Sequence, residues 1–458
     1  MSKFLKNSYV TIGLMLFALF FGAGNLIFPA FLGAYSGENV WLAILGFCIT
    51  GVGLPMLGVA AIAYSGSSDV ADYAGRVSKT FGVFFAVALY LSIGPLFAIP
   101  RTGATSYSIG IEPIFGTSLT VKIIYALVFF GITYFLAINP SKIADRVGKF
   151  LTPSLLIVIG ILATASYLKA TSGYGTPLNS GKGVADSFAD TPFVAGFIQG
   201  YGTLDTLASL AFAIIVINAA KLFGAKTGKE VSSITLKSGL LSVSLLAVVY
   251  IFIARIGAIS QDLFSLQGGA LTYKGDAISG GIVLSLTSDY FLGNLGQVVL
   301  AAIIFLACLT TSTGLVTACS EYFHRLMPKF SERFWVTLFT IISTLLYFNG
   351  LTNIIKWSVP VLYLLYPPTV ILVFITFLDK IFDSRREVYA TTVGFTFVPA
   401  LYDSISTFSA LTEWFKVPAG VTKFFTETVP LGNYSLGWLG FSLVGFVVSF
   451  IYVKVVKK

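Results

Sequence analysis

Glycines and an amide side chain interrupt an apolar stretch near the start of the chain. The stretch FFGAGNL (20–26) places Gly22, Ala23, Gly24 and Asn25 in the middle of a long uncharged run. Each glycine lowers helix propensity by up to about 1 kcal/mol relative to alanine, so we expect a helix to break here. A break leaves amides and carbonyls unpaired, and an apolar environment tolerates them only where they are buried in protein beside a polar ligand.

The two ends of this break are predicted to bind groups of opposite charge. The amides of Ala23, Gly24 and Asn25 would open the second half-helix and suit an anion such as a carboxylate. Carbonyls at the end of the first half-helix would suit a cation or an ammonium group. Those carbonyls belong to Ala18, Phe21 and Gly22.

A later apolar stretch, IQGYGTLD (198–205), again combines a Gly-x-Gly with polar residues. Its candidate site residues are Gly200, Tyr201, Thr203 and Asp205. The alternative for the first stretch is a packing surface on which Gly22, Gly24 and Gly33 let two helices approach. Packing alone would not require a second interruption, so the pair favours two broken helices.

Asp205 lies within the second interrupted stretch. A carboxylate inside an apolar span is by default a functional candidate, in contact with an ion or a substrate. The other interpretation is local, because an aspartate directly before a helical run is a favoured N-cap. The two roles are compatible, and the sequence leaves both open.

Four consecutive hydroxyl residues lie in LACLTTSTG (306–314). Thr310 and Thr311 follow Ala307 by three and four residues, so both hydroxyls and the Ala307 carbonyl can share one side of a helix. The structural alternative is that such hydroxyls only return a hydrogen bond to the preceding turn. Neutral oxygens, completed by carbonyls of a broken helix, suit sodium better than a divalent cation, which prefers more carboxylates.

The elements that must position these residues are membrane-spanning helices. Of 458 residues, 56% are hydrophobic and 11% are charged, against about 25% charged in a typical soluble domain. We count twelve apolar windows, each with at most one charged residue, near or above the roughly 20 residues that an α-helix needs to cross a bilayer. They cover 8–33, 39–64, 80–100, 123–141, 150–168, 192–218, 238–254, 290–320, 334–355, 357–378, 390–410 and 434–453.

Several other classes of protein are disfavoured by composition. The single histidine, His324, argues against a histidine-based metal site or a Ser-His-Asp hydrolase. The 3 cysteines lie in apolar windows and give no disulfide framework or metal-ligand spacing. We therefore expect no enzyme activity, no cofactor beyond a coupling ion, and no obligate protein partner. The net charge of +9 need not imply a nucleic-acid partner, because membrane topology accounts for it.

The distribution of Lys and Arg predicts the orientation of the chain. With the N-terminus in the cytoplasm, most of the 29 Lys and Arg residues fall on the cytoplasmic side, as the positive-inside rule requires. Both termini are then cytoplasmic, and 1–458 is one transmembrane domain. Five spans from each interrupted segment define halves of about 8–168 and 192–378 that enter the membrane from opposite sides, with additional helices near 390–410 and 434–453.

Three motifs resemble those of one known family. FFGAGNLIFPAFLG (20–33), IGPLFAIPRTGATSYSIGI (93–111) and GYGTLDTLASLAF (200–212) are similar to the bacterial branched-chain amino acid:cation symporters, LIVCS or BrnQ-type carriers. The likeness covers nearly the whole chain. It implies an all-α polytopic protein of the bacterial plasma membrane, with twelve helices in a five-plus-five inverted-repeat core of the LeuT type plus two extra helices. It also implies sodium-coupled uptake of leucine, isoleucine and valine by alternating access.

A remoter resemblance joins the first motif and LACLTTS to neurotransmitter:sodium symporters. It implies that the substrate carboxylate meets Ala23 and Gly24. The sodium ligands that it implies are Ala18, Phe21, Ala307, Thr310 and Thr311. In this chain three residues, Leu26, Ile27 and Phe28, separate Asn25 from Pro29. The neurotransmitter:sodium symporters have four residues there, and one of the four is an arginine. Arg101 is a candidate for the charged outer gate which that arginine forms, or an anchor at the membrane interface.

Two other functions stay open at this stage. A proton-coupled permease of the same fold, for another amino acid or a nucleobase, would use Asp205 as its proton carrier. A channel, which belongs to a different class, would conduct ions without a substrate.

Overall fold

The computed structural model describes residues 8–116, 118–138, 152–168, 173–181 and 183–455. Some of the Lys and Arg residues that the predicted orientation assigns to the cytoplasm lie outside these residues: Lys3, Lys6, Lys142, Arg146, Lys149, Lys457 and Lys458. The start of the window at 150–168 lies outside them too.

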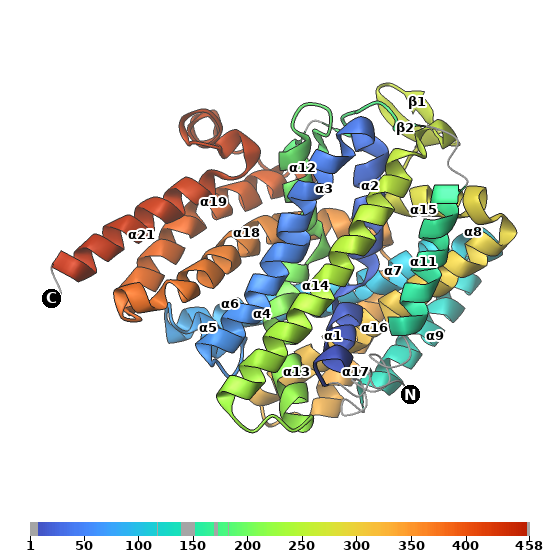
Figure 1. Ribbon diagram of the computed structural model, residues 1–458. Coiled ribbons are helices and arrows are strands. Elements are labelled where there is room, and N and C mark those ends of the chain that lie inside the picture. Colours follow the sequence, from blue (N-terminus) through green and yellow to red (C-terminus); the bar gives the residue numbers. More distant parts are fainter. Residues whose placement is uncertain (1–7, 117, 139–151, 169–172, 182, 456–458) are drawn as a thin grey trace.

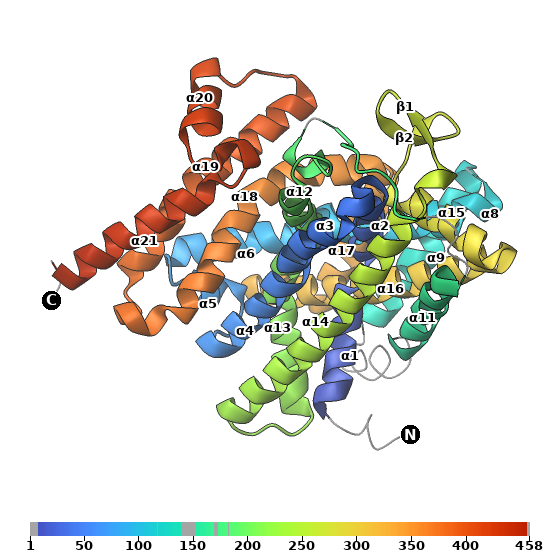
Figure 2. The same ribbon diagram turned by 45° about the horizontal axis from the view of Figure 1, so that its top comes forward.

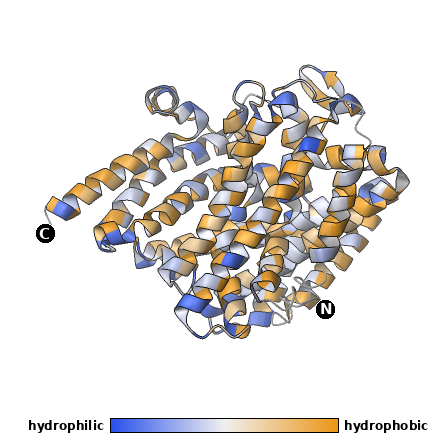
Figure 3. Cartoon of the chain, viewed as in Figure 1, coloured by the Kyte–Doolittle hydropathy of each residue, from blue (hydrophilic) through white to orange (hydrophobic). Residues whose placement is uncertain are grey.

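Apolar helices form nearly all of the described structure (Figure 1). Within the described residues, 8 helical segments are long and apolar enough to cross a membrane. Hydrophobic residues cover the flanks of the helices and hydrophilic ones gather at their ends (Figure 3). The all-α polytopic class is confirmed, and the count of twelve spans stays a prediction.

The first half of the chain contains both unbroken and interrupted spans. Its α-helices are α1 (Ser8–Phe20), α2 (Ala23–Ser36), α3 (Val40–Cys48), α4 (Leu54–Ser65), α5 (Val70–Ala74), α6 (Lys79–Leu91), α7 (Ala98–Gly110), α8 (Glu112–Phe115), α9 (Leu119–Ala137) and α11 (Thr152–Leu168). A 3₁₀ turn, η1 (Gly37–Asn39), precedes α3, and π-helical turns, η2 (Ile49–Gly53) and η3 (Ser92–Leu96), join α3 to α4 and α6 to α7.

The second half begins with the other interrupted span. Its α-helices are α12 (Pro192–Gln199), α13 (Asp205–Leu222), α14 (Gly228–Ala258), α15 (Gly280–Leu292), α16 (Asn294–Leu326), α17 (Glu332–Tyr347), α18 (Leu351–Phe377), α19 (Arg386–Thr412), α20 (Ala419–Lys423) and α21 (Gly437–Val455). Shorter helical turns are η6 (Val184–Asp186), η7 (Gly200–Thr203), η8 (Gln261–Leu263), η9 (Asp379–Phe382), η10 (Phe424–Thr428) and η11 (Gly432–Tyr434).

The connection between α14 and α15 is rich in Gly and Ser, yet it is structured. It holds a small antiparallel sheet of β1 (Ser265–Gln267), β2 (Ala270–Tyr273) and β3 (Asp276–Ala277), with Leu266 paired to Leu271. The predicted apolar window at 290–320 does not begin with one helix. Helix α15 ends at Leu292 and α16 begins at Asn294, so the start of the window is wrong. Gly293 divides them with a φ of +65°, which residues with a side chain rarely adopt.

Small residues let the helices of the first and second halves pack closely. A Cβ added to Gly33 of α2 would lie 2.0 Å from the carbonyl oxygen of Ala254 in α14. A Cβ on Gly46 of α3 would lie 2.1 Å from the Phe193 carbonyl oxygen in α12. The packing alternative is therefore correct for Gly33. Figures 1 and 2 show α2 beside α14, and α19 with α21 along one edge of the molecule.

Candidate substrate and ion site

Both predicted interruptions are present and lie deep in the molecule. Helix α1 ends at Phe20 and α2 begins at Ala23, with Gly22 in an extended conformation between them. Helix α12 passes into the turn η7, and Leu204 takes a φ of +68° before α13 begins at Asp205. A positive φ is unfavourable for leucine and persists only where the surrounding structure holds the backbone in place. Such residues cluster at functional sites.

Asn25 connects the two breaks. Its Oδ1 accepts a hydrogen bond from the Gly22 amide at 3.0 Å. Its Nδ2 donates to Asp205 Oδ2 at 2.5 Å and also to the hydroxyl of Tyr250 in α14. The amide side chain therefore closes the broken end of α2 and joins it to the start of α13.

The Asp205 carboxylate does not cap a helix. The residue is the first of α13, and the N-cap position is Leu204, without a side-chain cap. Instead Oδ2 of Asp205 accepts from Asn25 and, at 3.1 Å, from the Tyr250 hydroxyl. A charge buried among apolar helices is costly unless it is paired, so this carboxylate is held by donors from two other spans.

Arg101 of α7 lies inside the protein rather than at a membrane surface, because only 4% of it is exposed. Its Nη1 donates to the Gly202 carbonyl oxygen at 2.6 Å, and its Nη2 donates to the Thr203 carbonyl oxygen at 3.2 Å. The interface-anchor interpretation is therefore wrong. The guanidinium satisfies carbonyls that the break in the second span leaves without helical partners.

A small cavity lies between the two breaks. Its polar lining includes Asn25, Arg101, Asp205 and Thr311. Its apolar lining includes Leu19, Phe20, Ile93, Ala98, Ala208, Phe212 and Leu315. Both broken spans also contribute small residues to the lining, namely Gly22, Gly24 and Thr203. The cavity thus offers charge and hydrogen bonds on one part of its wall and hydrocarbon on the other.

Carbonyl and hydroxyl oxygens meet where α1 approaches α16. Thr310 Oγ1 donates to the Ala18 carbonyl at 2.8 Å and to the Ala307 carbonyl at 2.9 Å. Thr311 Oγ1 donates to the Leu19 carbonyl at 2.9 Å and lies 3.4 Å from that of Ala18. Five neutral oxygens from two spans therefore gather at one place.

The structure brings some predicted site residues together and leaves others apart. Thr311 Oγ1 would lie 2.8 Å from a Cβ added to Gly22, so the oxygen cluster adjoins the break. Tyr201 stacks on Tyr366 of α18 at 4.3 Å between ring centroids, and neither it nor Gly200 lines the cavity. The carbonyl to which Thr311 donates belongs to Leu19 and not to Phe21. The role of Phe21 as an ion ligand therefore stays a prediction.

Three contacts of the site were missed from sequence. Tyr250 lies in an uninterrupted apolar helix, and nothing in its surroundings in sequence marks it. The Leu19 carbonyl is a backbone group, which no residue type reveals. Arg101 was named only as a gate or an interface anchor, although a lone arginine within an apolar span is expected to face the bundle interior and pair with carbonyls.

Solved structures with the same arrangement of helices define the fold. Mhp1, a nucleobase-cation-symport-1 family transporter solved in a closed conformation with bromovinylhydantoin bound, matches with a TM-score of 0.59 and 12% identity, over 97% of this chain and 92% of its own. A Na+-coupled sialic acid symporter matches with a TM-score of 0.57 and 13% identity, over 96% and 89%. MhsT in complex with L-phenylalanine gives 0.51 and 16%, over 96% and 98%. The fold is that of LeuT-type membrane transporters.

Sequence relatives identify the family within this class. A family model described as branched-chain amino acid transport protein matches residues 5–456, and this chain belongs to that family. The branched-chain amino acid permease BrnQ of Bacillus subtilis (strain 168) is 40% identical over 455 residues, 98% of each chain. The permease BraB of the same strain is 42% identical over 445 residues, 96% of this chain and 94% of its own. The protein is therefore a bacterial multi-pass membrane transporter and not an enzyme.

Proposed function

We propose that the protein carries leucine, isoleucine and valine into the cell together with sodium, by alternating access. The observation that supports this most directly is the position of Thr311, which lines the cavity and also belongs to the oxygen cluster between α1 and α16. Substrate and ion would thus share one wall, and binding of one would change the surroundings of the other.

The residues that line the cavity suit an amino acid with an aliphatic side chain, and the cavity must widen to admit one. The first amides of α2, at Ala23 to Asn25, have no intrahelical acceptors and form an anion site for the substrate carboxylate. Asp205 is the negative group available to the substrate ammonium. Phe212 and Leu315 offer the apolar surface for a branched side chain. This division of the wall is the usual plan of a small-molecule site.

The oxygen cluster suits sodium. In the absence of an ion, Thr310 and Thr311 donate their protons to the carbonyls of α1. When an ion binds, both hydroxyls would turn their protons away and present lone pairs together with the Ala18 and Ala307 carbonyls. The C-terminal end of α1 carries the negative end of a helix dipole, which further favours a cation.

Coupling follows from the location of the ion between two spans. Sodium would tie α1 to α16 and thereby favour the conformation in which the cavity accepts substrate, since a ligand stabilises the state that it binds better. We propose that residues of about 8–168 and 192–378 form an inverted repeat, that one part of the helix bundle rocks around the site, and that both termini are cytoplasmic. Each broken span then contributes one end of the site.

Uptake of labelled leucine into proteoliposomes tests this proposal. We expect saturable uptake that requires an inward sodium gradient and is inhibited by unlabelled isoleucine and valine. Lysine is the matched competitor that the apolar wall should reject. Uptake that ignores sodium would contradict the coupling, and absence of leucine uptake would contradict the substrate.

The buried carboxylate of Asp205 supports a second candidate function, that of a proton-coupled permease. Asp205 lines the cavity and is held by two donors, as a proton carrier would be. In that case a pH gradient would drive uptake in sodium-free buffer, and Asp205→Asn would abolish the response to that gradient. We favour sodium because its proposed ligands are already assembled beside the cavity.

A further inference from the structure

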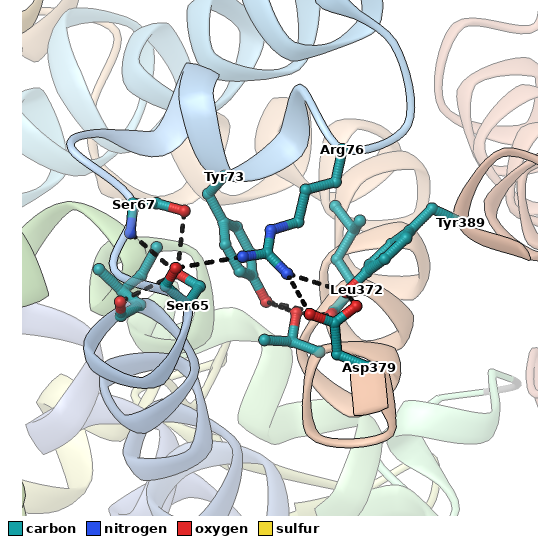
Figure 4. Close-up of polar contacts among 9 residues, drawn as sticks. Ser65, Ser67, Tyr73, Arg76, Leu372, Asp379 and Tyr389 are labelled. Atoms are coloured by element: carbon teal, nitrogen blue, oxygen red, sulfur yellow. Dashed lines mark hydrogen bonds and ion pairs between the residues drawn. The ribbon is translucent and has the colours of Figure 1, made fainter. Parts of the chain in front are cut away.

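Arg76, between α5 and α6 in sequence, lies at the centre of a polar cluster whose residues are not part of the cavity lining (Figure 4). Its Nη1 donates to Asp379 Oδ2 at 3.0 Å and to the Tyr389 hydroxyl at 3.1 Å. Its Nη2 donates to the carbonyl oxygen of Ser65 at 3.2 Å. One planar guanidinium therefore bonds two parts of the chain at once, as its fork of donors allows.

The segment that carries Arg76 is bound to α18 and α19. The hydroxyl of Tyr73 donates to the Leu372 carbonyl at 3.0 Å, and Nε of Arg386 donates to the Val77 carbonyl at 2.8 Å. These bonds lie on either side of Arg76 in sequence. Together with Asp379 they fix the guanidinium to the turn between α18 and α19.

Ser65 lies 11 residues before Arg76, on the other side of the short connection between α4 and α5. It is the last residue of α4, and the span of α3, η2 and α4 is bound to the second broken helix on both sides of its break. Thr50 Oγ1 donates to the Phe197 carbonyl in α12 at 2.8 Å, and Thr206 Oγ1 of α13 donates to the Thr50 carbonyl at 3.1 Å. A movement of the broken span would therefore carry α4 with it.

We propose that Arg76 is a positioning residue of the transport cycle, which holds the end of α4 against the turn between α18 and α19 while the cavity is enclosed. This inference rests on the proposed alternating-access function. When α4 moves, the bond from Nη2 to the Ser65 carbonyl breaks, whereas Asp379 and Tyr389 keep the guanidinium in place for the return. Because the Arg76 side chain is 24% exposed, water can replace the lost acceptor.

A reporter cysteine in the cavity measures this role. Ala208 lines the cavity, so Ala208→Cys is introduced after Cys48, Cys308 and Cys319 are replaced by alanine. The protein is reconstituted in vesicles, and a membrane-impermeant maleimide is added on the side of the membrane that carries α5. The labelling rate then reports how often the cavity opens to that side.

Arg76→Gln and Asp379→Asn are expected to raise this labelling rate about fivefold, the effect of losing a partly exposed hydrogen bond to a charged group. Asp383→Asn is the matched control, because Asp383 lies in the same turn and its ion pair of 3.7 Å is with Lys454 of α21. Among the described residues no hydrogen bond or ion pair joins Asp383 to α4. This variant should label at the unmodified rate. Tyr389→Phe removes one bond that orients the guanidinium and should give a smaller increase, which covers the case in which Arg76→Gln fails to fold.

Equal labelling rates in all variants, or an equal increase in Asp383→Asn, would overturn the inference. Thermal unfolding of each variant shows that the comparison is made on folded protein. Leucine binding to the unmodified protein is measured separately. If leucine does not bind, the proposed substrate fails, but the labelling rates still report whether Arg76 restrains α4.

Discussion

At the scale of single residues, the site consists of groups that satisfy one another across two broken helices. Asn25 bonds to Gly22 and to Asp205, and Arg101 bonds to the carbonyls of Gly202 and Thr203. The sequence predicted the interrupted stretches because glycine and buried polar residues are unusual in apolar spans. It could not predict which distant donors reach them, since that depends on the packing of α7 and α14 against the breaks.

Thr311→Ala should raise the sodium concentration needed for half-maximal leucine uptake by about tenfold or more. The change removes one oxygen of the cluster, and a hydrogen-bonding group that serves a charged partner is worth about 1.5–3 kcal/mol. Thr317→Ala is the control, because within the described part of the chain the Thr317 hydroxyl bonds to its own helix alone, at the Thr313 carbonyl, 2.9 Å away. Sodium-titrated uptake in proteoliposomes makes the measurement. Equal sodium dependence of the two variants would refute the assigned ion site.

Tyr250→Phe should weaken leucine binding by about tenfold and leave the fold intact. The change removes the hydroxyl that donates to Asp205 at 3.1 Å and accepts from Asn25, and the partners of a buried charge are then incompletely satisfied. Tyr90→Phe is a suitable comparison, since this buried tyrosine stacks on Tyr322 away from the cavity. Leucine binding in detergent checks the result. Equal loss in both variants would show that Tyr250 acts only through packing.

At the scale of elements, close approach between helices positions the two breaks. Apolar windows located the long helices of the described chain, while the count of twelve spans stays a prediction. They failed at α15, which is a short helix separated from α16 by Gly293, because periodicity cannot divide a continuous apolar stretch. They also gave no sign of which glycine packs and which breaks a helix. Gly33 packs against α14, whereas Gly22 adjoins the site.

Gly33→Ala should lower the stability of the purified protein by about 1–3 kcal/mol, the usual cost of overpacking. An added Cβ would lie 2.0 Å from the Ala254 carbonyl oxygen, and backbone atoms cannot turn aside as a flexible side chain can. Gly131→Ala in α9 is the control, because nothing lies within 4 Å of its added Cβ, and it should be neutral or stabilising by up to about 1 kcal/mol. Thermal unfolding in detergent compares the two variants. Equal midpoints would contradict the close packing of α2 on α14.

At the scale of the whole molecule, the charge pattern and the fold concern different questions. The fold is of the LeuT type, and membership of the transporter family follows from relatives that span nearly the full chain. The orientation in the membrane rests on the distribution of Lys and Arg, part of which lies outside the described residues. It stays a prediction from the positive-inside rule.

Cysteines placed at the two ends of the molecule should be labelled from opposite sides of the membrane. Lys274 lies in the turn between β2 and β3, and Ser384 lies between η9 and α19. In intact cells, a membrane-impermeant maleimide should modify Lys274→Cys and spare Ser384→Cys until the cells are opened. The reverse pattern would invert the predicted topology and place both termini outside.

The central claim is that sodium and a branched-chain amino acid bind side by side and move together. The most direct test is the uptake of labelled leucine in proteoliposomes, measured with and without a sodium gradient and with isoleucine and valine as competitors. The account predicts uptake that depends on sodium and is inhibited by both competitors. Leucine uptake of equal rate in sodium-free buffer under a pH gradient would contradict it.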